Sequence, residues 1–283
     1  MKNCRWIMAG TAMVVMLAMP MLAFGGKPSP TSKICQANNI EQDTPETREQ
    51  CQQAAKRGNA AAQNYVGVMY LHGHGVEEDE EEAVEWFRKA ANQGYAQAQD
   101  NLGNMYLEGM GVARDRGEAK KWLRKAADQG YVQAQYNLGV VYQRESYPEA
   151  LKWFRKAAEQ GDADGQNALG GMYYEGWGVA KDYAEAMKWF RKAEKQGNAA
   201  AQNNLGEMYF EGHGVAKDYA EAMTWFRKAA EQGDDNAQYN LGRMYHEGQG
   251  VAEDRAEAVK WYKKAAEQGN SSAQAVLWRM DEK

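Results

Sequence analysis

Tryptophan recurs at a nearly constant interval through most of this 283-residue chain, and that period constrains the fold more than any other feature. Successive tryptophans of the series lie 36, 31, 36, 36 and 36 residues apart, and a glycine that follows leucine or valine keeps the same intervals with the same single deletion. Two independent markers with one period indicate an internal repeat of about six units. The two series are Trp86, Trp122, Trp153, Trp189, Trp225 and Trp261, and Gly67, Gly103, Gly139, Gly170, Gly206 and Gly242.

Each unit predicts two helices, as residues 198–233 illustrate. Asn198 is placed to cap a first helix, and Gly212 to end it in a left-handed conformation. Asp218 followed by Glu221 forms a capping box for the second helix. Apolar residues recur at helical spacing in both segments, which predicts one buried face on each. They are Ala201, Leu205, Met208 and Tyr209 in the first, and Ala222, Trp225, Phe226, Ala229 and Ala230 in the second.

The third unit and the two ends depart from this pattern. The third lacks the glycine loop, yet Ser146 with Glu149 rebuilds a cap for its second helix. Residues 46–57 resemble a lone second helix, and residues 270–280 a lone first helix. We therefore expect an all-α fold, an α/α superhelical solenoid with half-repeat caps at residues 46–283. The expected units are 59–94, 95–130, 131–161, 162–197, 198–233 and 234–269 with a C-terminal cap at 270–283, and the expected core comprises the six tryptophans with Leu102, Leu138, Leu169, Leu205 and Leu241.

Residues 1–25 have the layout of a bacterial-type secretory signal peptide, with Lys2 and Arg5 before an apolar run. Cleavage would leave an N-terminal extension at residues 26–45 and a periplasmic or secreted protein, whereas an uncleaved segment would act as an anchor. Without that segment the formal net charge falls from −5 to −7. Such a surface repels phosphate backbones and anionic lipid, so we expect no nucleic-acid partner and no membrane contact after cleavage.

Cys35 and Cys51 are the cysteines that remain after the signal segment, and both precede the repeats. An even number in an oxidising compartment predicts one disulfide. The alternative is two free or merely buried thiols.

The unit from Ala199 to Gly233 has the pattern A-x-A-Q-x-x-L-G-x-M-Y-x-x-G-x-G-V-x-x-D-x-x-x-A-x-x-W-F-R-K-A-A-x-Q-G and closely resembles the Sel1-like repeat, which is related to the tetratricopeptide repeat. The resemblance covers roughly residues 46–280. It implies an α/α superhelix used for protein interaction. One secreted bacterial branch of the family is similar to β-lactam-binding proteins and pairs two cysteines in each repeat. The repeats here contain no cysteine, so that activity is not carried over.

A search for catalytic patterns finds no GxSxG, HExxH, CxxC or phosphate-binding loop in the sequence. We therefore expect no catalytic residues, no cofactor and no metal. His72 and His74 share one loop and could draw on nearby glutamates for a metal, but loop histidines that face water explain the same pattern.

Two positions of the first helix vary from unit to unit while the packing positions stay constant. We expect this exposed register to line a concave groove for a protein or peptide, with Tyr136 and Tyr239 as aromatic anchors. The alternative is that these residues drift because nothing touches them. The second of the two positions also carries Val68, Val140 and Gly171. The proposed groove residues, here called the stripe, are Asn64, Asp100, Asn104, Tyr136, Asn167, Asn203, Glu207, Tyr239 and Arg243.

The sequence thus favours a monomeric interaction scaffold of the periplasm or the exterior. A β-lactam-binding or cell-wall-active enzyme is the alternative from a different class, and an inhibitor or immunity-type binder of a secreted effector is a further one.

Overall fold

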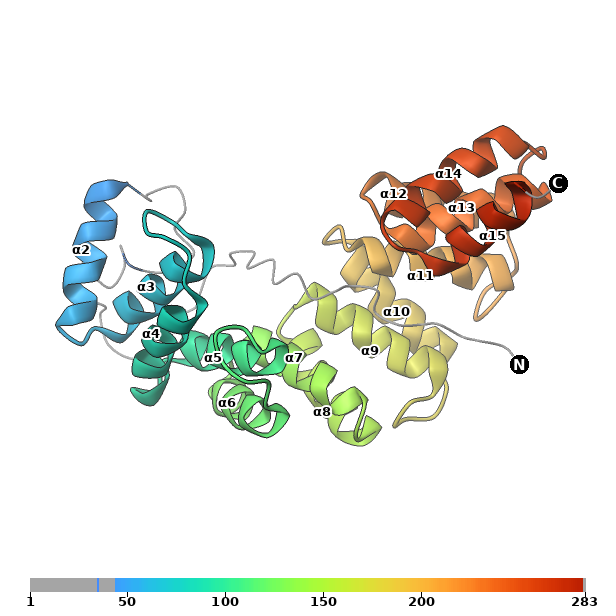
Figure 1. Cartoon of the computed structure of the whole chain (residues 1–283). Helices are drawn as coiled ribbons and strands as arrows, with labels where there is room; N and C mark the ends of the chain where they lie inside the picture. Colours follow the sequence, from blue (N-terminus) through green and yellow to red (C-terminus); the bar gives the residue numbers. More distant parts are fainter. Residues whose placement is uncertain (1–34, 36–43, 282–283) are drawn as a thin grey trace. The chain divides into compact units, whose positions relative to one another are not determined.

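The computed structural model describes Cys35 and residues 44–281. The predicted signal segment at residues 1–25 and most of the extension at 26–45 lie outside this part. The described residues contain 14 helices and no strand (Figure 1).

First and second helices alternate along the chain, as the repeat predicts. The lone helix α2 (Pro45–Lys56) matches the predicted N-terminal half-repeat, and α15 (Ser271–Asp281) matches the C-terminal one. The first helices of the six units are α3 (Ala60–His72), α5 (Ala96–Glu108), α7 (Val132–Gln143), α9 (Ala163–Glu175), α11 (Ala199–Glu211) and α13 (Asp235–Glu247). The second helices are α4 (Glu80–Asn92), α6 (Arg116–Asp128), α8 (Tyr147–Glu159), α10 (Tyr183–Glu194), α12 (Tyr219–Glu231) and α14 (Arg255–Glu267).

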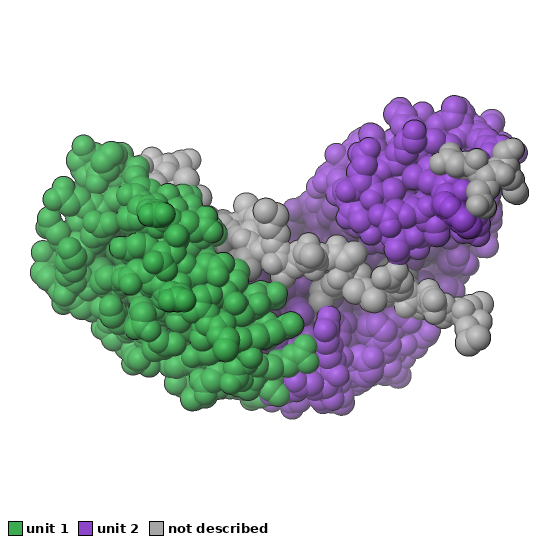
Figure 2. Space-filling model, viewed as in Figure 1, with its two compact units in different colours: residues 1–126 green, residues 127–283 purple. Residues whose placement is uncertain are grey.

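The chain divides into two compact units, residues 1–126 and 127–283, which Figure 2 colours separately. Within each unit, every helix packs mainly on the helices that precede and follow it in sequence: α2 to α5 in the first unit and α7 to α15 in the second. This pairing of consecutive helices is the arrangement of an α/α solenoid, so the predicted fold class is confirmed.

The helix ends follow the predicted caps at all but one position. In the repeat at residues 198–233, Asn198 Oδ1 accepts from the amide of Ala201 at 2.8 Å, and Asp218 Oδ1 accepts from the amide of Glu221 at 3.0 Å. Gly212 ends the first helix in the left-handed region with φ +76°. The prediction for the third unit was wrong in one respect, because Ser146 occupies the N-cap position but its side chain makes no capping hydrogen bond. A proline in the first turn of α8 supplies the helical backbone angle there.

In five of the six units the repeated glycine packs against an aromatic ring of the second helix, and in the second unit Gly103 packs against Leu123 instead. A Cβ placed on Gly206 would lie 2.6 Å from Cδ1 of Phe226, so only glycine allows this approach. Phe226 is fully buried, as are the five predicted core leucines. Trp86 and Trp225 are only partly buried. The other four tryptophans are buried, as predicted, and the residue that follows the tryptophan in each second helix is buried in all six units.

Buried glutamines, which were not among the predicted core residues, link successive helices by hydrogen bonds. Gln238 on α13 donates to the carbonyl of Ala230 in α12 at 3.2 Å and accepts from Gln268, just after α14, at 2.8 Å. One side chain thus connects three consecutive helices.

The N-terminal end is closed by the predicted disulfide. The Cα atoms of Cys35 and Cys51 are 5.5 Å apart and both residues are fully buried. They pack in one apolar cluster with Ala54 of α2 and with Ala62 and Met69 of α3. The disulfide thus joins a residue of the N-terminal extension to the first core cluster.

Candidate protein-binding surface

The stripe lies on the first helices, but its residues differ in depth. Three are buried, with exposed fractions of 0% for Asn64, 3% for Asp100 and 5% for Asn203, so the expectation that they are exposed is wrong. The other six are partly buried: Asn104, Tyr136, Asn167, Glu207, Tyr239 and Arg243.

Amide hydrogen bonds between neighbouring first helices explain two of the buried members, Asn64 and Asn203, and also hold the partly buried Asn167. In each case an asparagine that directly precedes the Leu-Gly pair donates to the stripe asparagine of the preceding unit. The distances are 2.9 Å for Asn101 to Asn64, 2.8 Å for Asn204 to Asn167 and 3.0 Å for Asn240 to Asn203. The recurrence of Asn before Leu-Gly is the sequence signal that could have predicted this ladder.

Where the stripe residue is tyrosine, the next unit provides an apolar partner position instead. At the position of the donating asparagine, the unit after Tyr136 has Ala168 and the segment after Tyr239 has Val276. The ring of Tyr136 lies 5.8 Å from that of Phe154, and Tyr239 lies 5.7 Å from Tyr262. Burial, with the nearby Asp164 and Asp162, raises the pKa of Tyr136. Both predicted anchors therefore also pack within the solenoid.

The structure brings three stripe residues together in one polar cluster between the last two complete units. We define the polar cluster as Asn203, Glu207 and Phe210 of α11 with Asn240 and Arg243 of α13. Oε1 of Glu207 accepts from the side-chain nitrogens of Asn203 at 3.3 Å and Asn240 at 3.4 Å. Desolvation raises the pKa of Glu207 to about 7, although these hydrogen bonds and the positive charge of Arg243 oppose the shift. Burial thus favours the neutral form of the Glu207 carboxyl.

Gly171 occupies the same repeat position as Glu207 and Arg243, but in α9. A Cβ on Gly171 would meet no atom within 4 Å. Glycine in a helix interior costs about 1 kcal/mol relative to alanine, so it usually has a packing reason. Here the fold supplies none.

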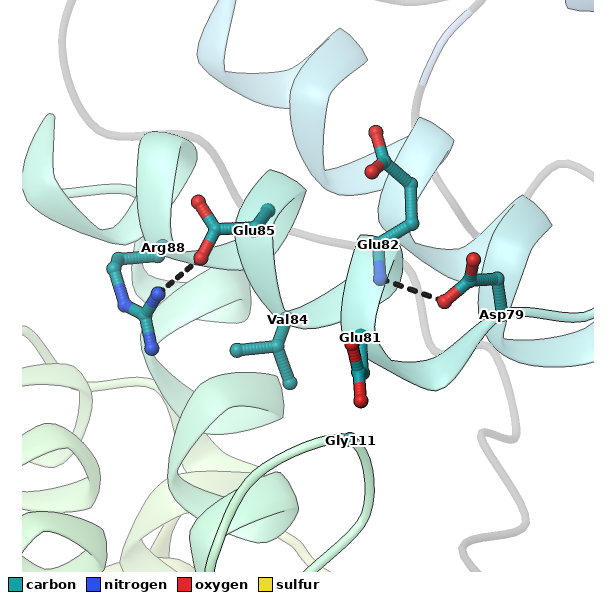
Figure 3. A pocket seen from close by; sticks show the side chains of 7 residues that line it. All are labelled: Asp79, Glu81, Glu82, Val84, Glu85, Arg88 and Gly111. Atoms are coloured by element: carbon teal, nitrogen blue, oxygen red, sulfur yellow. Dashed lines mark hydrogen bonds and ion pairs between the residues drawn. The ribbon is translucent and has the colours of Figure 1, made fainter.

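A hollow lined by carboxylates lies in the first compact unit. This acidic hollow of about 310 Å³ lies beside the start of α4 (Figure 3). Its carboxylates make local contacts: Asp79 accepts from the amide of Glu82 at 2.9 Å, and Glu85 pairs with Arg88. These carboxylates support the helix start and its surface.

The loop histidines lie in two different environments. The rings of His72 and His74 are 5.6 Å apart, and burial and the neighbouring His74 lower the pKa of His72. His213 does not simply face water, because its ring stacks on Tyr183 at 4.7 Å and its Nδ1 lies 2.6 Å from the hydroxyl of Tyr174. Within the described part of the chain, no group of three or more His, Cys, Asp or Glu side chains is placed to hold a metal ion.

Comparison with known families matches the Sel1 repeat six times, and each match begins one residue after the corresponding predicted unit. The matched residues are 60–95, 96–131, 132–162, 163–198, 199–234 and 235–270. The chain belongs to the Sel1 repeat family. The predicted resemblance is thereby confirmed.

Solved structures support the same assignment. A Sel1 repeat protein from Oxalobacter formigenes is 31% identical with a TM-score of 0.74, over 84% of this chain and 97% of that one. A protective antigen of uropathogenic Escherichia coli is 40% identical with a TM-score of 0.69, over 88% of this chain. This Sel1 repeat chain spans 55% of that antigen's length.

More distant similarity shows the fold alone. An immunity protein of Pseudomonas aeruginosa is 23% identical with a TM-score of 0.52. No curated protein matches the chain. Among the described helices, none has the length and apolar character needed to cross a membrane.

Proposed function

We propose that this Sel1 repeat protein is a secreted or periplasmic scaffold that binds a protein or peptide along the partly exposed part of the stripe within residues 127–283. The Sel1 fold is one generally used for protein–protein interaction.

The open space beside Gly171 is the observation that most supports the proposed binding surface. Gly171 lies between Val140 of α7 and Glu207 of α11 in the series of equivalent repeat positions, and both of those residues are partly exposed. A glycine with open space above it leaves a notch in a helix surface, where a partner's main chain or a large side chain can approach closely. Glycine has a low helix propensity, and packing gives no reason for it at this position. Binding of a partner would explain it.

The proposed location is supported by the Cys35–Cys51 disulfide, because structural disulfides persist in oxidising compartments. The basic and apolar segment at residues 1–25 is consistent with export.

A non-enzymatic role is part of the proposal. It is supported by Asp79 and Glu85 of the acidic hollow, which engage groups of α4, and by His213, whose ring stacks on Tyr183. Hydrolysis of a chromogenic β-lactam by the purified protein would contradict this part of the proposal and favour the enzymatic alternative.

The binding surface is tested by Gly171→Leu, which places a large side chain at a position where a Cβ meets no atom within 4 Å. The mature protein and its variants are immobilised, exposed to envelope extract, and the captured proteins are identified by mass spectrometry. We expect capture of a specific protein by the wild type and its loss in Gly171→Leu. Glu231→Leu, on an exposed position of a second helix, is the matched control and should capture normally. Equal capture by Gly171→Leu and the wild type would overturn the proposed surface.

A further inference from the structure

Arg243 is a cation of the polar cluster that has no acceptor within the described residues. Its guanidinium carbon lies 4.2 Å from the centre of the Phe210 ring, so the side chain is fixed by a cation–π contact. No ion pair or hydrogen bond joins it to the described part of the chain, and its Nε is buried without a partner. Buried donors of this kind are nearly always paired in folded proteins.

The packing of the repeat does not require an arginine here. No other complete unit has arginine at the equivalent position, and none pairs it with an aromatic ring in the same way. The equivalents of Arg243 are Val68, Asn104, Val140, Gly171 and Glu207, and the equivalents of Phe210 are Leu71, Leu107, Gln143, Tyr174 and His246.

The nearest carboxyl group does not neutralise Arg243. Glu207 acts on it electrostatically but forms no ion pair with it, and its Oε1 is held by Asn203 and Asn240 instead. The guanidinium therefore keeps its charge and its donors while it is held in place on a ring. Because Nε is buried, an incoming carboxylate would meet the Nη atoms, which make no hydrogen bond within the described residues. A planar guanidinium can bind a carboxylate through two parallel hydrogen bonds.

We propose that Arg243, fixed on Phe210 beside Asn240, is a receptor for a carboxylate of the protein or peptide that this chain binds. The proposal rests on the proposed function and adds the chemistry of the partner. The carboxylate belongs to an aspartate or glutamate side chain or to a chain terminus, and these two sources present the same group to the guanidinium.

Acidification should strengthen this contact. Glu207 loses its negative charge as the pH falls through about 7, which removes repulsion of the incoming carboxylate. The other groups that face the site are Asp234, whose pKa is raised to about 6 mainly by burial, and the hydroxyls of Tyr262 and Tyr174, whose pKa values are raised mainly by burial. Of these groups, Asp234 has a pKa close to that of Glu207. Glu207→Gln therefore separates the effect of Glu207 on the pH dependence of binding from that of Asp234.

The test uses small probes and the folded mature protein. The Nε–Hε signals of the arginines are followed by NMR during titration with N-acetylglutamate N-methylamide, which has only a side-chain carboxylate, and with N-acetylalanine, which has only a terminal one. The glutamine analogue of the first probe is the neutral control. We expect a saturable shift of the Arg243 signal with at least one carboxylate and none with the neutral probe. Binding should weaken about tenfold in Arg243→Lys, because the planar fork is lost.

Arg227→Lys is the matched control, because Arg227 already donates to the hydroxyl of Tyr245 at 3.1 Å. It should leave the probe affinity unchanged, and Glu207→Gln should remove most of the gain in affinity on acidification. Circular dichroism establishes that each variant is folded. Absence of a saturable shift at Arg243, or equal shifts with the neutral probe, would overturn the receptor. If capture of the partner is lost in Gly171→Leu but unchanged in Arg243→Lys, the carboxylate receptor is overturned while the proposed function stands. If capture is unchanged in both variants, the result counts against both proposals.

Discussion

Two adjacent glycines of α9 should respond in opposite ways to the same substitution. A Cβ on Gly170 would lie 2.6 Å from Cδ1 and 2.7 Å from Cε1 of the Phe190 ring, and 3.2 Å from the carbonyl oxygen of Ala186. A Cβ on Gly171 would meet nothing within 4 Å. Gly170→Ala and Gly171→Ala therefore make the same chemical change in one helix with and without a clash.

The expected magnitudes follow from these distances. Carbon atoms in contact are normally about 3.5 to 4 Å apart, so in Gly170→Ala the ring or the helix must move by roughly 1 Å. Phe190 is fully buried, and overpacking of a core costs about 1 to 3 kcal/mol. Alanine regains about 1 kcal/mol of helix propensity at either position. We expect Gly170→Ala to be less stable than Gly171→Ala by about 1 to 3 kcal/mol, because the helix propensity regained is the same and only Gly170→Ala overpacks the core. Relative to the wild type, Gly170→Ala should lose up to about 2 kcal/mol and Gly171→Ala should gain up to about 1 kcal/mol.

Urea unfolding followed by far-UV circular dichroism measures both changes. A shift of the transition to lower urea for Gly170→Ala and to higher urea for Gly171→Ala would support the reasoning. The interpretation of the glycine–phenylalanine contact would be refuted by a Gly170→Ala variant as stable as Gly171→Ala. A destabilised Gly171→Ala variant would show that the notch over α9 is not open.

Three further predictions concern the asparagine ladder, the disulfide and Glu207. Asn240→Ala removes the donor to Asn203 and Glu207. It should lower the free energy of unfolding in urea by about 1 to 3 kcal/mol, because these acceptors lose a hydrogen-bond partner. Replacing Cys35 and Cys51 by alanine should lower the unfolding free energy by about 3 kcal/mol in the chain-entropy estimate and make the melting temperature insensitive to reductant. Because burial raises the pKa of Glu207 to about 7 from 4.5, its contribution to stability is full below 4.5 and is lost as the pH rises through 7. The free energy of unfolding of Glu207→Gln should therefore rise relative to that of the wild type by up to about 3 kcal/mol as the pH is raised from acidic to slightly alkaline. A difference that does not change with pH would contradict the raised pKa of Glu207.

The sequence determined the repeat, the helix boundaries and most of the caps, because these depend on contacts within one unit. Asp218 caps a helix by accepting from the amide of Glu221, three residues away, and Gly212 ends one through its own backbone angle. Ser146 was the exception. A serine in the N-cap position does not show from sequence whether its hydroxyl turns toward the helix.

The depth of the stripe was decided only by the tertiary structure. Helical periodicity tells which face of a helix a residue lies on, but in a solenoid a first helix also packs against the first helix of the next unit. Asn203 thus looks like a variable surface residue, whereas Asn240, 37 residues later, buries it with a hydrogen bond.

The same reason applies to the proposed receptor. The sequence placed Arg243 on the stripe, but only packing put its guanidinium on Phe210, a residue of the preceding unit, and left its Nε without a partner. Local signals fix the helices because their hydrogen bonds close within a few residues. The binding chemistry depends on side chains more than thirty residues apart, and their distances are set by how the units stack.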